Sequence, residues 1–158
     1  MDFKSRAVRS LVELHEAEFP KFLDTWDRFA ASDAPMPEAH GDPDYETREK
    51  LLSHVLRCGL SYLTWIGECL GRPVTDVKPE TDPEILARTR RDFTAEVLKA
   101  WRRHLPEVTY AELGPMTYRT RWGEQFSIEA MLEHAVVHPM RHRIQLERIL
   151  QERAASER

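Results

Sequence analysis

The chain has 158 residues, 41% of them hydrophobic, which suits one core and leaves too little for a second. We therefore expect residues 1–158 to form a single domain. Lys and Arg number 23 against 27 Asp and Glu, a net charge of −4, so no general attraction to nucleic acid is expected. No apolar run approaches the roughly 18 to 20 residues of a membrane span, and the N-terminus lacks the apolar stretch of a signal peptide. The sequence thus predicts a cytoplasmic protein without a membrane partner.

Apolar residues recur at spacings of three and four over long stretches, which indicates a mostly helical chain. A first helix is expected over residues 3–31, bent at Pro20 because proline removes a backbone donor. A proline-rich loop follows. The second helix should begin near Asp44 and end where Gly71 takes the left-handed conformation.

A third helix is predicted from Asp82, as N-cap, and Pro83, at the first helical position, to Leu105. Residues 107–125 lack helical periodicity and form a long connection. Within it, residues 108–113 and 116–122 are candidate strands of a short hairpin before the last helix.

Ser127 is the expected N-cap of the last helix, which should reach about Arg153. Four long helices joined by connections of ten or more residues predict an all-α four-helix bundle. Cys58 and Cys69 stand eleven residues apart on one predicted helix, too far to bridge. We interpret both as reduced core residues.

The last predicted helix carries three histidines at intervals of four residues. At about 100° per residue, His142 falls near the middle of the apolar arc and His138 within about 50° of its centre, whereas His134 lies nearer 90° away. Burying two unpaired imidazoles one turn apart is costly unless their nitrogens find partners. The pair therefore indicates either a metal site or two hydrogen-bonded core histidines.

A third ligand must come from another helix, and His54 is the histidine in the body of the second one. Three imidazoles with open positions are typical of a catalytic metal site rather than a closed structural one. His134 is interpreted as a surface residue or a supporting neighbour of the ligands. Gln145 is either a hydrogen-bond partner of a ligand histidine or an ordinary boundary residue. His15 could approach the site from the first helix or pack in the core.

His54 and the run His134-x-x-x-His138-x-x-x-His142-Arg143-x-Gln145 resemble the DinB/YfiT-like family of metal-binding four-helix bundles, over nearly the whole chain. The resemblance implies that His54, His138 and His142 bind one divalent metal ion, with zinc as first choice and nickel or manganese as alternatives. It also implies an up-up-down-down helix order, a long crossover between the second and third helices, and a homodimer. Pro139, between two of the ligands, departs from the family pattern.

The resemblance implies a thiol-dependent S-transferase-like or hydrolase-like enzyme. Its metal would activate a low-molecular-weight thiol, or water, against a small-molecule substrate. Trp122, in an irregular segment, is the candidate wall of the substrate pocket. The alternative is a non-enzymatic metal-binding or small-ligand-binding bundle, in which the ion ties two helices together. A di-iron bundle is excluded, because the sequence has no Glu-x-x-His pair.

Overall fold

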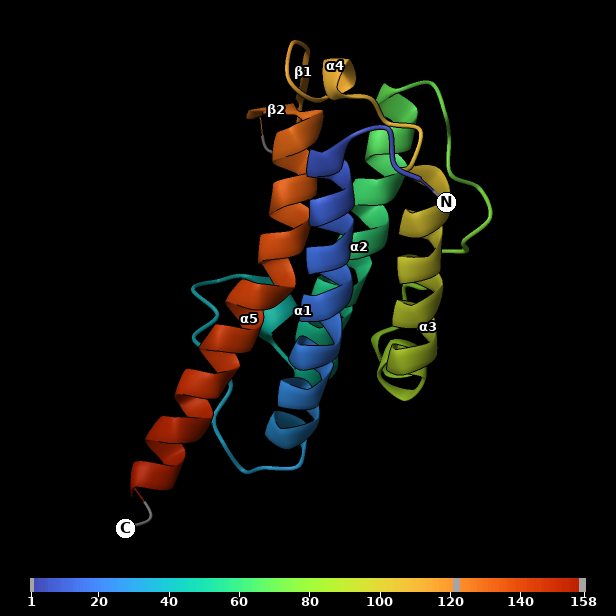
Figure 1. The fold of residues 1–158 in the computed structure, drawn as a ribbon. Coiled ribbons are helices and arrows are strands. Elements are labelled where there is room, and N and C mark those ends of the chain that lie inside the picture. Colours follow the sequence, from blue (N-terminus) through green and yellow to red (C-terminus); the bar gives the residue numbers. More distant parts are fainter. Residues whose placement is uncertain (1, 121–122, 157–158) are drawn as a thin grey trace.

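The computed structural model describes residues 2–120 and 123–156, and this part of the chain is mostly helical (Figure 1). The two strands pair antiparallel, with Tyr118 opposite Phe126. The prediction of an all-α protein is confirmed at this level. The elements follow in the order α1 (Arg6–Ala30), the 3-10 turn η1 (Pro43–Tyr45), α2 (Arg48–Cys69), α3 (Pro83–His104), α4 (Tyr110–Leu113), β1 (Thr117–Arg119), β2 (Gln125–Ser127) and α5 (Ile128–Ser156).

The boundary between α2 and α3 follows from local sequence, as predicted. Gly71 has a φ of 66°, and the N–H of Arg72 donates to the carbonyl of Gly67 at 2.7 Å. This is the Schellman pattern that ends a helix. The Asp82 side chain accepts from two backbone N–H groups of the next turn, and Pro83 takes the first helical position. Both cysteines are free.

Two helix starts differ from the predicted ones. The first helix begins at Arg6 rather than at residue 3, because the Ser5 side chain accepts from the backbone N–H three residues on and fixes the N-cap there. The second begins after Thr47, whose hydroxyl accepts from Lys50 at 3.2 Å. Asp44 consequently lies in η1, outside the helix that was expected to contain it.

Residues 108–113 do not form the predicted strand. Most of them lie in α4, because the Glu112 carboxylate accepts from the backbone N–H of Thr109 at 2.8 Å and from its hydroxyl at 2.9 Å. A Thr-x-x-Glu pair of this kind starts a helix. The strand predicted within residues 116–122 is present as β1, but its partner is β2, which follows it in the chain.

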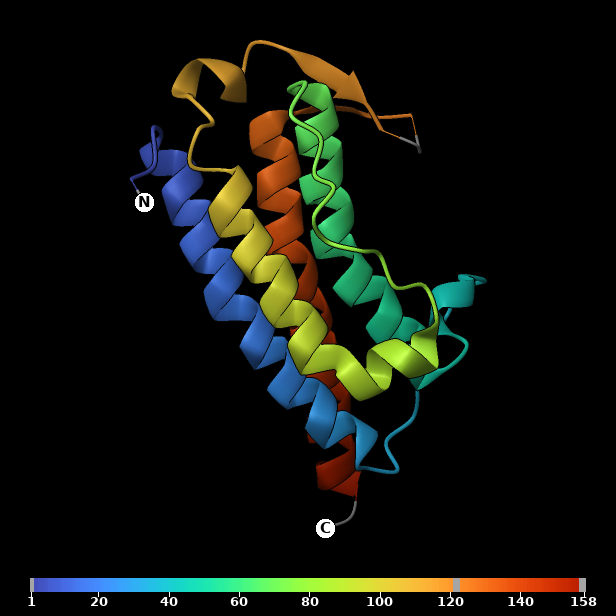
Figure 2. The same ribbon diagram turned by 90° about the vertical axis from the view of Figure 1, so that its right-hand side faces the viewer.

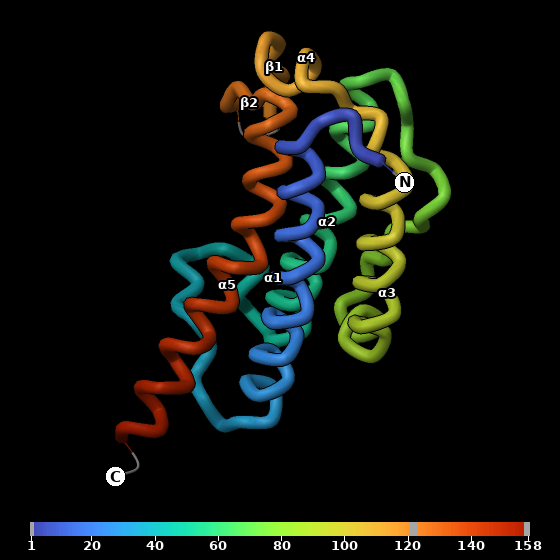
Figure 3. Tube along the Cα trace, viewed as in Figure 1, coloured from blue at the N-terminus to red at the C-terminus, as the bar shows by residue number. Residues whose placement is uncertain are grey.

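The long helices form two pairs. α1 runs parallel to α5, and α2 runs parallel to α3 in the opposite direction (Figures 1 and 3). Asp33, just beyond α1, pairs with Arg153 near the end of α5, whereas Glu16 in the first half of α1 pairs with Arg102 near the end of α3. The order is therefore down-up-up-down, and the predicted up-up-down-down order is wrong. The predicted long crossover is present, since residues 70–82 run back beside α2 to the start of α3 (Figure 2).

Arg48, the first residue of α2, explains why α2 turns back along α1. Its guanidinium lies 4.6 Å from the centre of the Phe29 ring. Hydrogen bonds from the same guanidinium satisfy carbonyls that the end of a helix leaves free, and they hold the start of α2 against the end of α1. The guanidinium donates to the carbonyls of Phe29, Ala30, Ser32 and Ala34 at 2.8 to 3.0 Å.

We expect Arg48→Ala to lower the free energy of unfolding by about 2 to 3 kcal/mol, because several charge-assisted hydrogen bonds are lost together. Arg48→Lys keeps the charge but not the planar guanidinium, so its free energy of unfolding should lie between those of the wild type and Arg48→Ala. Urea denaturation of the three proteins measures this. Equal stability of the alanine variant and the wild type would contradict the role given to Arg48.

His15 is packed in the core rather than at the candidate site. It is fully buried, stacks on Trp101 with ring centroids 3.9 Å apart, and meets the edge of Phe19 at 4.8 Å. Neither of its ring nitrogens has a hydrogen-bond partner among the described residues. Burial lowers the pKa of His15 from 6.5 to about 3, so the ring is neutral in the folded protein at neutral pH.

This burial predicts a pH-dependent stability. The pKa of His15 is lower in the folded than in the unfolded state, so protonation of this ring favours unfolding. The contribution of neutral His15 to the free energy of unfolding is therefore complete above pH 6.5 and is lost as the pH falls towards 3. The loss approaches about 1.4 kcal/mol per pH unit for this group. His15→Leu should therefore be more stable than the wild type at pH 5 and lose less stability between pH 7 and pH 5, measured by denaturation of metal-free protein. Identical pH profiles would show that His15 does not carry this dependence.

Candidate metal centre

Three histidines meet between α2 and α5, which run antiparallel at this level. His54 comes from α2, and His138 and His142 come from successive turns of α5. The Nε2 atoms of His54 and His138 are 3.0 Å apart, and one ring nitrogen from each of the three histidines lies within 4.8 Å of the others. The structure thus brings together the residues that the sequence singled out, and the group could hold a metal ion.

The two histidines of α5 are buried and uncharged. His138 is 8% and His142 7% exposed, as their angular positions on the helix predict. Burial lowers the pKa of His138 to about 2 and that of His142 to about 4, and the neighbouring imidazoles add to both shifts. At neutral pH each ring keeps a lone pair, which is the state that a metal ligand requires.

Two side chains outside the histidine group orient the rings of His54 and His142. Nδ1 of His54 lies 2.7 Å from Oδ2 of Asp44, and Nδ1 of His142 lies 3.3 Å from Oε1 of Gln145. Because both partners are acceptors, each Nδ1 carries the hydrogen and each Nε2 is left with its lone pair. This carboxylate or amide support on the far side of the ring is typical of metal-binding histidines.

One of the three donor separations, that between His54 and His138, is close to the separation expected around a tetrahedral ion. Ligand nitrogens at about 2.0 to 2.1 Å from zinc would be separated by about 3.3 Å from one another, close to the 3.0 Å between His54 and His138. Two ring nitrogens at this distance need either a shared proton or a cation between them. Since Asp44 already takes the hydrogen of His54, a cation satisfies both lone pairs, whereas a shared proton must come from His138.

Asp44 is the functional residue that sequence reasoning missed. It was expected to open the second helix, but η1 turns the chain so that Asp44 reaches back to His54 ten residues later. The next residue, Tyr45, lies with its ring centroid 6.0 Å from that of His142. A separation of ten residues across a turn has no helical periodicity, so no pattern in the sequence points to this contact.

The other predicted residues lie outside the three-histidine group. His134 is half-buried and stacks on Tyr62 with centroids 5.3 Å apart; its ring centroid lies 6.0 Å from that of His138, so it is a neighbour of the group rather than a member. Gln145 does contact a histidine of that group, as one of its two interpretations predicts. Trp122 lies outside the described residues, so its place at a pocket stays a prediction.

Pro139 does not interrupt α5, which continues from Ile128 to Ser156. Figure 1 shows the lower half of this helix slanting away from the direction of the upper half. A proline removes a backbone donor and crowds the preceding turn, which bends a helix without ending it. The helix thus continues through Pro139, and the rings of His138 and His142 both lie beside that of His54, with centroids 4.7 and 5.3 Å away.

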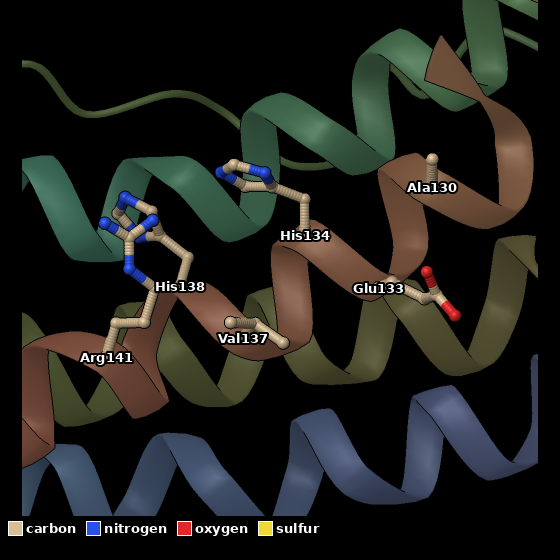
Figure 4. Close-up of a pocket in the computed structure, with 6 residues that line it drawn as sticks. All are labelled: Ala130, Glu133, His134, Val137, His138 and Arg141. Carbon is tan, nitrogen blue, oxygen red and sulfur yellow. The ribbon is translucent and has the colours of Figure 1, made fainter.

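A pocket of about 240 Å³ opens beside the three histidines along α5 (Figure 4). His138 belongs both to this pocket and to the histidine group, so the pocket adjoins the centre. Its lining residues all come from α5 and are Ala130, Glu133, His134, Val137, His138 and Arg141.

Comparison with known proteins finds no matching family model, no matching curated protein and no matching solved structure. The likeness to DinB/YfiT-like proteins therefore rests on the histidine pattern of the sequence alone. Within the described residues, none of the helices has the combined length and apolarity needed to cross a bilayer.

Asp44→Asn should weaken zinc binding by about 10-fold to 100-fold, because the amide no longer holds the His54 ring as a carboxylate does. Competition with a chromophoric chelator measures the affinity. Glu46→Gln is the matched control, since it removes one carboxylate two residues away whose partner is Lys50. An equal loss in both variants would point to general charge rather than to the Asp44–His54 contact.

Proposed function

We propose that this protein is a DinB/YfiT-like four-helix bundle in which His54, His138 and His142 bind one divalent metal ion. The observation that carries the proposal is the convergence of three imidazoles, two of which, His54 and His142, have their Nδ1 atoms engaged by partners outside the group. Zinc is the first choice for three nitrogen ligands, and nickel or manganese are the alternatives. The homodimer that the resemblance implies is part of the same proposal.

The function proposed for this centre is that of a thiol-dependent S-transferase-like or hydrolase-like enzyme. A bound divalent ion would lower the pKa of a coordinated thiol or water and so supply a nucleophile. Asp44 and Gln145 orient the ligand rings, and burial keeps His138 and His142 unprotonated. Three protein ligands leave a coordination position for the reacting molecule, and the pocket beside His138 supports access to it.

A non-enzymatic metal-binding protein is the second candidate, and the deep burial of His138 and His142 favours it. In that case the ion mainly ties α2 to α5. Zinc at a hundred times its dissociation constant would then add about 2.7 kcal/mol of stability, without turnover of any thiol acceptor or ester. Turnover that depends on added metal would favour the enzyme instead.

Zinc titration of tag-free protein tests the proposal. The wild type should bind one zinc ion per chain, and His142→Ala should lose that stoichiometric binding, because two imidazoles remain where three are needed. His40→Asn is the control, since His40 is exposed in a loop with a φ of 45° that asparagine tolerates. Full zinc content in His142→Ala, measured by elemental analysis, would remove His142 from the ligand set.

A further inference from the structure

The pocket beside the metal centre has one cationic end and one anionic end. Figure 4 shows Arg141 with His138 at one end, and Glu133 with Ala130 at the other. Val137, which is 43% exposed, forms an apolar wall between them. The cationic end is therefore the one next to the three histidines.

Among the described residues, no ion pair neutralises the charge of Arg141. Its side chain is exposed. Arg143, two residues on, pairs with both Glu18 and Glu147. Arg141 lacks this option on its own helix, because no carboxylate stands three or four residues to either side, where a helical partner would be. Those positions hold Val137, His138, Ile144 and Gln145.

Arg141 lies next to the histidine group. It lines the same pocket as His138, which stands one helical turn before it on α5. An anion that pairs with the guanidinium would thus lie close to the proposed metal ligands. A guanidinium offers two parallel N–H groups to a carboxylate, sulfonate or phosphate, which makes it a selective partner for such groups.

We propose that Arg141 binds the anionic group of a small ligand whose other end reaches the metal centre. This inference rests on the proposed function and names its ligand class: a short molecule with a metal-binding atom, an apolar chain along Val137, and one carboxylate, sulfonate or phosphate. Glu133 disfavours a second anionic group at the far end of the pocket. Arg141 is accordingly the residue that selects anionic ligands over neutral ones.

Two thiols with the same three-carbon chain test the proposal on zinc-loaded protein. 3-Mercaptopropane-1-sulfonate carries the anionic group, and 3-mercapto-1-propanol carries a hydroxyl in its place. Isothermal titration calorimetry should show the sulfonate binding about tenfold more tightly to the wild type, the effect of one charge-assisted contact at a partly exposed site. Arg141→Gln should remove this preference and leave the zinc content unchanged.

Arg148→Gln is the matched control. Arg148 is exposed and stands seven residues after Arg141 on the same face of α5, outside the pocket. It should keep the tenfold preference, and Glu133→Gln should keep or increase it. Equal loss in the Arg141 and Arg148 variants would reduce the effect to general charge and overturn the proposal.

Three further outcomes are distinguishable. Zinc binding with a sulfonate preference that survives in Arg141→Gln would contradict this inference alone, as would failure of both thiols to bind. Failure of the wild type to bind zinc would contradict the proposed function and this inference with it. A change of oligomeric state in Arg141→Gln, seen by size-exclusion chromatography instead of a change in affinity, would assign this face to contact between copies of the chain.

Discussion

The site depends on one constraint: imidazole rings are buried between α2 and α5, away from water. Protonating a buried ring costs free energy because the charge is removed from water, so His138 and His142 stay neutral and keep their lone pairs. A buried lone pair in turn requires a partner. The contacts of Asp44 and Gln145 use the outer nitrogens of His54 and His142, which leaves the inner nitrogens facing one another. One cation between the inner nitrogens would give them a shared partner.

The arrangement of the histidines depends on where α2 begins. Arg48 binds the carbonyls at the end of α1 and fixes where α2 begins. The residues before it form η1, which places Asp44 against His54. The direction of α2, opposite to that of α5, then places His54 across from His138. A single arginine at a helix start thereby links the fold to the geometry of the candidate centre.

Much of this could be predicted from one sequence because it is local. Helical periodicity identified the long helices, Asp82-Pro83 and Gly71 marked their ends, and the angular positions of His138 and His142 predicted their burial. Helix direction could not be predicted, since it depends on the contacts of Arg48 across a loop. Asp44 was missed for the same reason. The Thr109-x-x-Glu112 pair that starts α4 was readable in the sequence, but β-type residues around it favoured a strand.

A zinc-edge anomalous difference map from crystals of the zinc-loaded protein tests the central claim most directly, because it locates the ion independently of affinity or activity. The account predicts one strong peak per chain, within about 2.0 to 2.1 Å of a ring nitrogen from each of His54, His138 and His142. A well-ordered trio of histidines with no peak between them, or a single strong peak at other residues, would contradict it.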